Sequence, residues 1–350
     1  MFFNKMGGIK LKILSIIIPT YNMDRYLDRC LLSILYSEKV NKDIEIIVVN
    51  DGGWDNSLNI ANKYKMEYKD TVVIIDKENK GHGSAINEGL KIAKGKYVKV
   101  VDADDWIDID SFEKFVNDLK NINSDFVVTN YVFENVYDND YEIVDYKKCT
   151  HLKKYDLNNF DINEIDNKYF SIHSITYCCK LLQDMNIVLD EKTFYVDMEY
   201  LILPLKNVNT FTYLNYNLYR YFIGRENQSI NIKSLISHRK DHERVIKRVL
   251  KEYEFLRETS KKKYILNILC ELIKTHYIIY CKGKCNGKIY RNEIRNFNRY
   301  LKNNYSDVYD LLLSNKFIKW NVNTNFIFSG LFNSMFSRIA DKFERRCESE

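Results

Sequence analysis

The sequence predicts an α/β fold with a mainly parallel central sheet, followed by a smaller helical region. Over residues 13–110, continuous apolar runs alternate with segments whose apolar residues recur at helical spacing. This pattern is typical of strands that are buried on both faces and joined by helices. After Ser229 the sequence changes to charged segments with helical periodicity. We therefore expect one domain at 1–232, with halves at about 13–110 and 111–232, and a helical domain at 233–350.

The individual elements follow from the spacing of apolar residues. Strands are expected at 13–18, 44–49, 72–75, 97–101 and 126–128, and helices at 26–35, 55–64 and 85–93. A left-handed cap at Gly95 is expected to end the third helix, because glycine adopts that conformation most readily. The polar stretch at 135–168 is predicted to be loop or an elaboration on the acceptor side.

Composition limits the classes of function. The 350 residues are 45% hydrophobic and 29% charged, and the formal charge of +5 is spread along the chain. A soluble globular protein with no nucleic-acid partner is expected. The sequence has no run of about 18 apolar residues, so no transmembrane helix is predicted. Residues 1–12 lack the apolar core of a signal peptide. We expect a cytoplasmic protein with reduced thiols, since cysteines such as Cys178 and Cys179 lie in apolar or helical contexts. A zinc site is not expected, because Cys281 and Cys285 lack partners at zinc-finger spacing.

Polar or acidic residues follow four successive predicted strands. They are Thr20, Tyr21 and Asn22 after the first strand, Asp51 after the second, Asp76 after the third, and Asp102, Asp104 and Asp105 after the fourth. Each alone fits an ordinary turn or helix cap. Together they predict a ligand site, because the carboxyl ends of parallel strands meet at one edge of a sheet.

The acidic motif at 102–106, Asp-Ala-Asp-Asp-Trp, carries the strongest chemical signal. Two carboxylates one residue apart can place one on a ribose and one on a divalent cation such as Mg²⁺ or Mn²⁺. Such a cation neutralises the charge of a departing diphosphate. The alternative is that Asp104 and Asp105 cap a helix that begins near Asp110.

A second candidate is the Asp-Gly-Gly turn at 51–53. The carboxylate of Asp51 can accept a hydrogen bond from a nucleotide base, and Gly52 and Gly53 permit a close approach of the backbone. An ordinary Asp-Gly turn is the alternative.

Four motifs resemble, in order and spacing, those of the family-2 glycosyltransferases. They are SIIIPTYN at 15–22, VVNDG at 48–52, NKGHGSAIN at 79–87 and DADDW at 102–106. The resemblance covers roughly the first 110 residues. It implies the GT-A fold and an enzyme of the kind that builds bacterial polysaccharides.

The resemblance also implies roles for individual residues of the donor site. Tyr21 would stack on a uracil-type base, Asp51 would hydrogen-bond it, Asp102 would contact ribose and phosphate, and Asp104 would coordinate the metal. Thr20, Asn22, Gly81 and Ala103 would line the same site. His82 lies at a predicted helix N-terminus, where it would contact the diphosphate or sugar, although a structural role is the alternative.

In similar enzymes the general base is often the second residue of a Glu-Asp pair. Asp197 matches that position here, whereas Val196 departs from it. As base, Asp197 would take the proton of the acceptor hydroxyl during attack on the anomeric carbon, which inverts that carbon. The alternatives are a carboxylate that merely starts a helix, and Glu199 as the base.

Several departures concern the donor and the diphosphate. The residues after Asp51 and Gly52 are Gly53, Trp54 and Asp55, where Ser-Thr-Asp is common, and Ile86 replaces a common arginine. Arg220 and Arg225 are candidates for a diphosphate contact on a segment that closes over the donor in similar enzymes. No Gln-x-x-Arg-Trp signature is found, which favours the addition of single sugars.

The C-terminal sequence raises a question about membranes. Apolar residues from Phe328 to Phe343 share one helical face opposite Arg338 and Lys342. Such a helix can pack on its own domain or lie in a membrane interface. The basic segment at 238–263 has the same two interpretations. Peripheral contact with the inner face of the cell membrane is therefore the alternative to a purely cytoplasmic location.

The leading hypothesis is an inverting, metal-dependent glycosyltransferase that uses Mn²⁺ or Mg²⁺. It would move a sugar from a nucleotide diphosphate donor, most simply a UDP-sugar, to a hydroxyl of a saccharide or lipid-linked saccharide acceptor. Bacterial surface polysaccharide or glycoconjugate synthesis would be its setting. The alternatives are a catalytically inactive partner subunit that binds nucleotide sugars, and a sugar-nucleotide pyrophosphorylase. Oligomeric state is not predicted.

Overall fold

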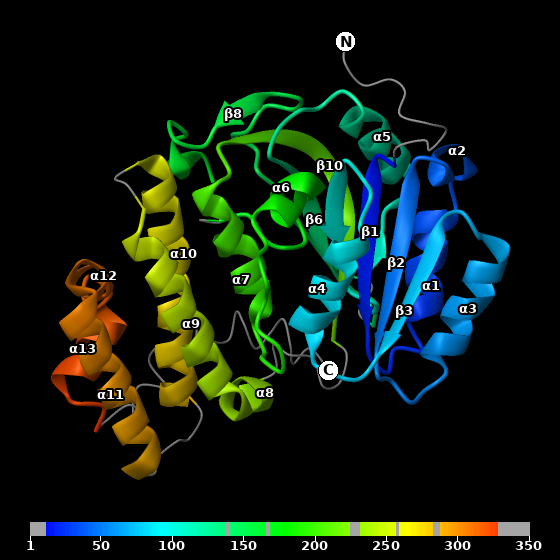
Figure 1. The fold of residues 1–350 in the computed structure, drawn as a ribbon. Coiled ribbons are helices and arrows are strands. Elements are labelled where there is room, and N and C mark those ends of the chain that lie inside the picture. Colours follow the sequence, from blue (N-terminus) through cyan, green and yellow to red (C-terminus); the bar gives the residue numbers. More distant parts are fainter. Residues whose placement is uncertain are drawn as a thin grey trace.

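The computed structural model describes residues 12–137, 140–165, 169–224, 232–256, 259–282 and 288–327. The first part of the chain alternates strand and helix (Figure 1). Its elements are β1 (Leu14–Thr20), α1 (Leu27–Leu35), α2 (Glu38–Asn41), β2 (Ile44–Asp51), α3 (Ser57–Glu67), β3 (Val72–Lys77), α4 (His82–Ile92), β4 (Tyr97–Val100), β5 (Trp106–Ile107) and α5 (Ile109–Leu119). The predicted strands and helices of residues 13–110 are thus all present.

The middle of the chain completes the sheet. Its elements are β6 (Phe126–Asn135), β7 (Asp140–Val144), β8 (Lys154–Asp156), the 3-10 helix η1 (Ile162–Glu164), β9 (Ile175–Cys178), α6 (Cys179–Asp184), α7 (Val196–Ile202), the 3-10 helix η2 (Leu203–Lys206) and β10 (Thr210–Ile223). The last part is helical, with α8 (Ile232–Ser237), α9 (Arg239–Glu254), α10 (Ser260–Lys282), α11 (Lys288–Asn304), α12 (Ser306–Leu312) and α13 (Lys316–Asn323).

Across the described residues, ten strands form one sheet in the order β3-β2-β1-β4-β9-β6-β10-β5, with β7 beside β6 and β8 beside β10. The four strands β1 to β4 pair in parallel, as predicted. Beyond them the sheet is mixed, because β9 runs antiparallel to both β4 and β6. The predicted fold class is confirmed, and the parallel part is the part in which the candidate site residues follow the strands.

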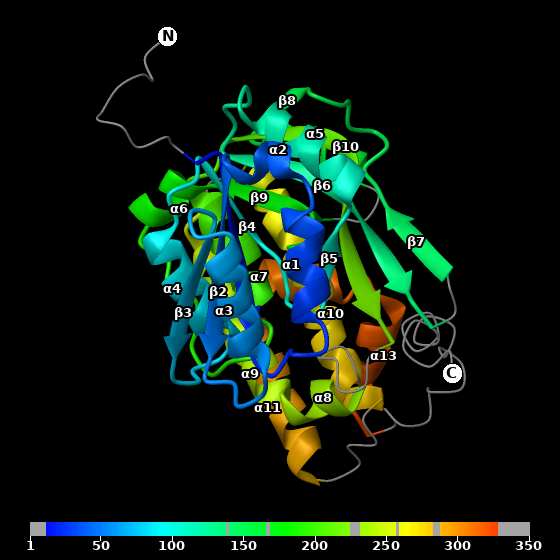
Figure 2. The same ribbon diagram turned by 90° about the vertical axis from the view of Figure 1, so that its right-hand side faces the viewer.

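Both faces of the parallel strands are covered by helices (Figures 1 and 2). Along β1, Ile16 and Ile18 join one apolar cluster with residues of α1, α3 and α5, whereas Ile17 joins a second cluster with residues of α4, α6 and α7. Successive side chains of a strand point to opposite faces, so a continuous apolar run is needed to fill both clusters.

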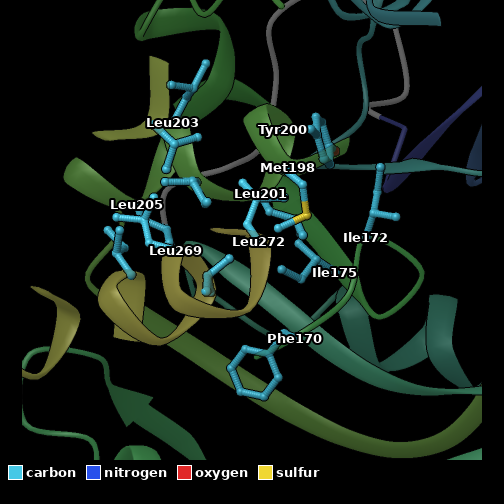
Figure 3. Packing of buried hydrophobic residues seen from close by; sticks show 14 of the residues in the cluster. Phe170, Ile172, Ile175, Met198, Tyr200, Leu201, Leu203, Leu205, Leu269 and Leu272 are labelled. Carbon is cyan, nitrogen blue, oxygen red and sulfur yellow. The ribbon is translucent and has the colours of Figure 1, made fainter. Parts of the chain in front are cut away.

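The helical region packs on the sheet domain through that second cluster. Leu201 and Leu205, on α7 and η2, belong to the same buried cluster as Leu269 and Leu272 of α10 (Figure 3). The two parts therefore share one core, and the division at 232/233 stays a prediction. None of the described helices combines the length and the hydropathy that a membrane span needs. The amphipathic segment at 328–343 lies outside the described residues.

Two details differ from the sequence-based expectations. The stretch 135–168, predicted as loop, contributes β7 and β8 to the sheet. β7 is almost wholly exposed, so it lacks the apolar alternation that would have revealed it. Gly95 is not left-handed, since the described glycines with positive φ are Gly52, Gly81 and Gly224. It is instead a site of close packing, where a Cβ atom would lie 2.5 Å from the backbone nitrogen of Ser15.

Candidate functional site

The carboxyl ends of β1, β2 and β4 meet the N-terminus of α4 at one edge of the sheet (Figure 1). Asp51, the last residue of β2, joins these parts. Its Oδ1 accepts hydrogen bonds from Lys77 Nζ at 2.5 Å and Lys80 N at 3.0 Å, and its Oδ2 accepts one from Gly81 N at 2.7 Å. Gly81 has a φ of 88°, which a residue with a side chain rarely adopts. The Asp51 carboxylate thus fixes the turn that leads into α4.

The end of β1 and the two residues after it lie at the same edge, where Tyr21 presents an exposed aromatic ring. Thr20 is buried, and its hydroxyl donates to the carbonyl oxygen of Ile18 at 3.1 Å. Asn22 is left-handed with a φ of 55°, and its Oδ1 accepts from Trp54 N at 2.9 Å. Between them the side chain of Tyr21 is 44% exposed, so its ring is accessible to a planar ligand.

His82, the first residue of α4, lies among the predicted carboxylates. Its Nε2 is 3.4 Å from Asp102 Oδ1, yet this buried nitrogen has no hydrogen-bond partner among the described residues. Burial lowers the pKa of His82, and the nearby charges of Asp197, Asp51 and Asp104 oppose that shift. Four acidic residues therefore lie around His82: Asp51, Asp102 and Asp104, which lie at or just after strand ends, and Asp197, at the start of α7.

The carboxylates of the acidic motif after β4 differ in their burial and in their hydrogen-bond partners. Asp105 is fully buried; its Oδ2 accepts from Tyr219 Oη at 2.5 Å and its Oδ1 from Phe222 N at 2.8 Å. Burial raises its pKa well above the usual range, as do the charges of Asp104 and Asp102. Ala103 and Asp104 are also buried. This crowding of carboxylates is the environment that a bound cation stabilises.

The capping alternative for this motif is wrong. The cap of α5 is Asp108, whose side chain accepts from Ser111 N at 3.0 Å. The N-cap position is thus taken by Asp108 and not by Asp104 or Asp105, so capping of α5 does not explain the two carboxylates of the motif.

A histidine that the sequence did not single out completes a metal-ligand geometry. Asp102, Asp105 and His173 each offer a ligand atom, and these atoms lie within 4.8 Å of one another. Carboxylate oxygen and imidazole nitrogen together suit Mn²⁺, and carboxylates suit Mg²⁺. The residues therefore fit a divalent cation. Asp104 lies outside this geometric group, and its role as a ligand stays a prediction.

Several contacts fix the position of His173. Its backbone carbonyl accepts from Lys99 Nζ at 2.7 Å, and its ring stacks on Tyr221 with the ring centres 4.4 Å apart. Its Nδ1 lies 3.1 Å from Ser171 Oγ. The antiparallel strand β9 brings this segment to β4. That strand pairing is not visible in the sequence pattern, which is why His173 was missed.

Asp197 and Glu199 lie on the first turns of α7 but have different partners. Glu199 is fully buried, and its Oε2 accepts from Arg248 at 2.8 Å and from Asp190 N at 2.9 Å. Asp197 is only partly covered. Burial nevertheless raises its pKa, and His82 opposes the shift. Glu199 is thus held in a structural ion pair, whereas Asp197 faces the acidic site.

Of the two arginine candidates, the structure describes only Arg220. Arg220 lies on β10, and its guanidinium pairs with Asp108 at 2.6 Å and Glu134 at 2.7 Å. It therefore ties β10 to α5 and β6. Arg225 and Cys285 lie outside the described residues, as does the side chain of Cys281.

Comparison with known proteins gives a consistent result. A family profile described as "Glycosyl transferase family 2" matches residues 15–186. An uncharacterized glycosyltransferase of Haemophilus influenzae is 32% identical over 192 residues, which are 54% of this chain and 72% of that protein. A poly(ribitol-phosphate) beta-glucosyltransferase of Bacillus spizizenii is 40% identical over 113 residues, or 32% of this chain.

The matched regions are small parts of some relatives. The match spans 18% of the Bacillus spizizenii protein and 16% of glycosyltransferase GlyA of Streptococcus pneumoniae. Among solved structures, S. aureus TarS 1–349 in complex with UDP superposes with a TM-score of 0.67 at 19% identity. That superposition covers 92% of this chain and 91% of the other, so the shared arrangement includes the sheet domain and most of the helical region.

Proposed function

Because this chain belongs to glycosyl transferase family 2 and is a glycosyltransferase, we propose that it moves a sugar from a UDP-linked donor to an acceptor hydroxyl with inversion. The observation that carries this proposal is the convergence on His82 of Asp51, Asp102, Asp104 and Asp197, which come from three different parts of the chain. A nucleoside diphosphate sugar needs a base contact, a charge clamp and a proton acceptor within one small site.

The donor would lie along the edge of the sheet. The exposed Tyr21 ring offers a stacking surface for the base. Asp51 Oδ2 accepts only the bond from Gly81 N among the described residues, so it retains a lone pair for a base N–H. Thr20, Asn22, Gly81 and Ala103 would shape the walls, and Asp102 would contact the ribose. S. aureus TarS, which shares the fold, has been crystallised with UDP, and this supports UDP as the nucleotide.

A Mn²⁺ or Mg²⁺ ion would be held by Asp104, with the group of Asp102, Asp105 and His173 beside it as further candidate ligands. When bound, it supplies the positive charge that offsets the departing diphosphate. His82, which burial keeps neutral near pH 7, would hydrogen-bond the diphosphate or the sugar through its unpartnered Nε2.

Asp197 would act as general base. Its pKa is raised by burial, which makes the carboxylate a better proton acceptor than an exposed aspartate. It would take the proton of the acceptor hydroxyl while that oxygen attacks the anomeric carbon on the face opposite the diphosphate. Attack from that face inverts the configuration of the anomeric carbon.

The acceptor would be a bacterial surface polymer or glycoconjugate, inside the cell or at the inner face of its membrane. Two similar proteins support this class, a poly(ribitol-phosphate) beta-glucosyltransferase and a minor teichoic acid biosynthesis protein, GgaB. Residues 13–110 would bind the donor, residues 111–232 the acceptor, and the helical region at 233–350 would extend the acceptor side.

The test is a panel of nucleotide sugars incubated with the protein, with and without Mn²⁺, reading diphosphate release and thermal shift. One UDP-sugar is expected to stabilise the protein only with the metal and to be slowly hydrolysed. If no nucleotide sugar binds with or without metal, the donor site assigned to this edge is wrong.

A further inference from the structure

A basic groove lies between α9 and α11, away from the donor edge. Its volume is about 730 Å³, and five of its lining residues are cations of α9: Lys240, Arg244, Lys247, Arg248 and Lys251. A helix rises about 1.5 Å per residue, so the row from Lys240 to Lys251 spans about 16 Å. The groove is therefore an extended surface rather than a pocket for a single small anion.

Part of this positive charge is not neutralised by the residues that the structure describes. Lys247 pairs with Glu243, and Arg248 pairs with Asp190 and Glu199. Arg244 and Lys251 are exposed and make no ion pair within the described residues. These two cations are available to an anionic ligand.

Lys240 contributes to the same excess of charge. It is 75% exposed and lies 3.9 Å from Glu293, whose carboxylate is already paired with Arg239 at 2.9 Å. One carboxylate is thus shared by two cations, which leaves net positive charge at this end of the groove as well.

The groove borders the segment that carries Asp197. Arg244 donates to Thr193 Oγ1 at 3.0 Å, and Arg248 donates to the carbonyl of Val188 at 2.6 Å as well as to Glu199. The rings of Phe194 and His238 stack beside them. The groove therefore lies beside the segment 188–199, which carries Asp197.

The lining also indicates the kind of anion. Glu243, Glu293 and Asn296 lie among the cations. The two carboxylates would repel a ligand that is negatively charged along its whole length. They can accept hydrogen bonds from hydroxyls. A phosphodiester polymer of polyols carries one negative charge per repeat with hydroxyls between, which matches this alternation. A flat bilayer surface does not enter a groove between two helices.

We propose that the α9–α11 groove binds a polyol phosphate acceptor polymer beside the segment that carries Asp197. This inference rests on the proposed transferase function and adds the chemical class of the acceptor. The cations of α9 would bind the phosphates directly, without a metal ion.

The test is binding of fluorescent oligo(ribitol phosphate), read by anisotropy, to the wild type and to Lys240→Glu/Lys251→Glu. Neither lysine touches the donor site. The double variant is expected to bind about tenfold more weakly, and the wild-type affinity is expected to fall with added salt. The matched control is Lys65→Glu/Lys69→Glu, which reverses two exposed lysines at α3 and just after it and should bind like the wild type.

Hydrolysis of the UDP-sugar without acceptor separates this proposal from the transferase function, because it needs only the donor edge. Unchanged hydrolysis with weakened oligomer binding supports the groove. Equal binding by both double variants and the wild type, in protein with an unchanged Tm, would overturn it. It would also be overturned if Lys240→Ala/Lys251→Ala weakened binding to phosphatidylglycerol vesicles but not to oligo(ribitol phosphate), since the occupant would then be a membrane.

Discussion

The donor edge of the sheet and the exposed face of α9 carry opposite charges. The donor edge gathers carboxylates around His82, whereas α9 presents a row of lysines and arginines. Both regions would bind anions in the proposed reaction. In the proposed reaction the donor diphosphate would need an added cation to enter an acidic site, while an anionic acceptor would be held by the chain itself.

The boundary between the two regions runs through α7. Asp197 faces His82 and the donor edge, and Glu199, two residues later, faces Arg248 of α9. Both residues carry a carboxylate and lie on the same turn of α7. The proposed difference between them, with Asp197 as general base and Glu199 in a structural ion pair, therefore rests on the groups that surround each carboxylate. Changing one carboxylate at a time is the way to test this.

The largest effect is expected for Asp197→Asn. The amide keeps the shape of the side chain but cannot take the acceptor proton, so kcat should fall by about 10²–10⁴. The Kd for the UDP-sugar should stay near the wild-type value, because the donor lies at the strand ends. Steady-state kinetics with calorimetric donor binding measure both; a variant with nearly normal kcat would exclude Asp197 as the base.

Asp104→Asn should lower metal-dependent turnover by about a thousandfold while the fold stays intact, since several kcal/mol of charge stabilisation would be lost. The measurement is turnover against Mn²⁺ concentration, with circular dichroism as the control for folding. An active variant that is insensitive to EDTA would remove the metal role. Asp102→Asn and His173→Ala, measured beside it, would tell whether the ion is centred on the motif or on the Asp102, Asp105 and His173 group.

Arg248→Ala should act on stability more than on chemistry. Glu199 is fully buried, so removing its cationic partner would lower the free energy of unfolding by about 1–3 kcal/mol. Urea denaturation measures the change. Lys247→Ala, next to it on α9 but paired with the partly exposed Glu243, is the control and should change stability by less than about 1 kcal/mol. Equal losses in the two variants would argue against the structural assignment of Glu199.

The pH profile should separate Asp197 from an exposed aspartate. The folded-state pKa of Asp197 is raised above its ordinary value, and only the ionised form can serve as base. Activity is therefore expected to be full at high pH and to fall, on acidification, at a higher pH than for an exposed aspartate. Log(kcat/KM) against pH tests this, with Tm followed over the same range. An acid limb at or below the ordinary aspartate pKa would contradict it.

The smallest expected effect concerns Lys99, which lies under His173. Burial lowers its pKa to about 7 from 10.5. Between these values the unfolded chain binds a proton that the folded chain has released, so the lysine makes stability rise with pH in this window. The free energy of unfolding of Lys99→Met, relative to the wild type, should therefore be higher at pH 7 than at pH 9.5. A difference independent of pH would show that Lys99 keeps an ordinary pKa.

The donor half could be predicted from the sequence because its signals are local. The apolar run around Ile17 fills two clusters at once, and Asp51 and Asp102 follow their strands directly. In contrast, His173 reaches the site through the pairing of β9 with β4, and β9 is a four-residue strand with no distinctive pattern. Sequence order gives no information about such a contact.

The acceptor side was predicted least well for a related reason. β7 is exposed and polar, so the apolar spacing that reveals buried strands is missing. The sequence identified the segment of α9 as basic, but the groove beside it also needs residues of α11. Likewise, the proposed roles of Asp197 as base and Glu199 as structural partner depend on the contact of Arg248 with Glu199. Both are consequences of packing between segments that are distant in the sequence.

The most direct test of the proposed donor and metal site is a crystal structure of the protein with UDP and Mn²⁺, in which anomalous scattering at the manganese edge locates the ion. We predict one strong peak within coordination distance of an Asp102 or Asp104 oxygen, with the UDP base over Tyr21 and the diphosphate beside His82. An ion and nucleotide bound elsewhere, or UDP bound at this edge with no manganese peak, would contradict it.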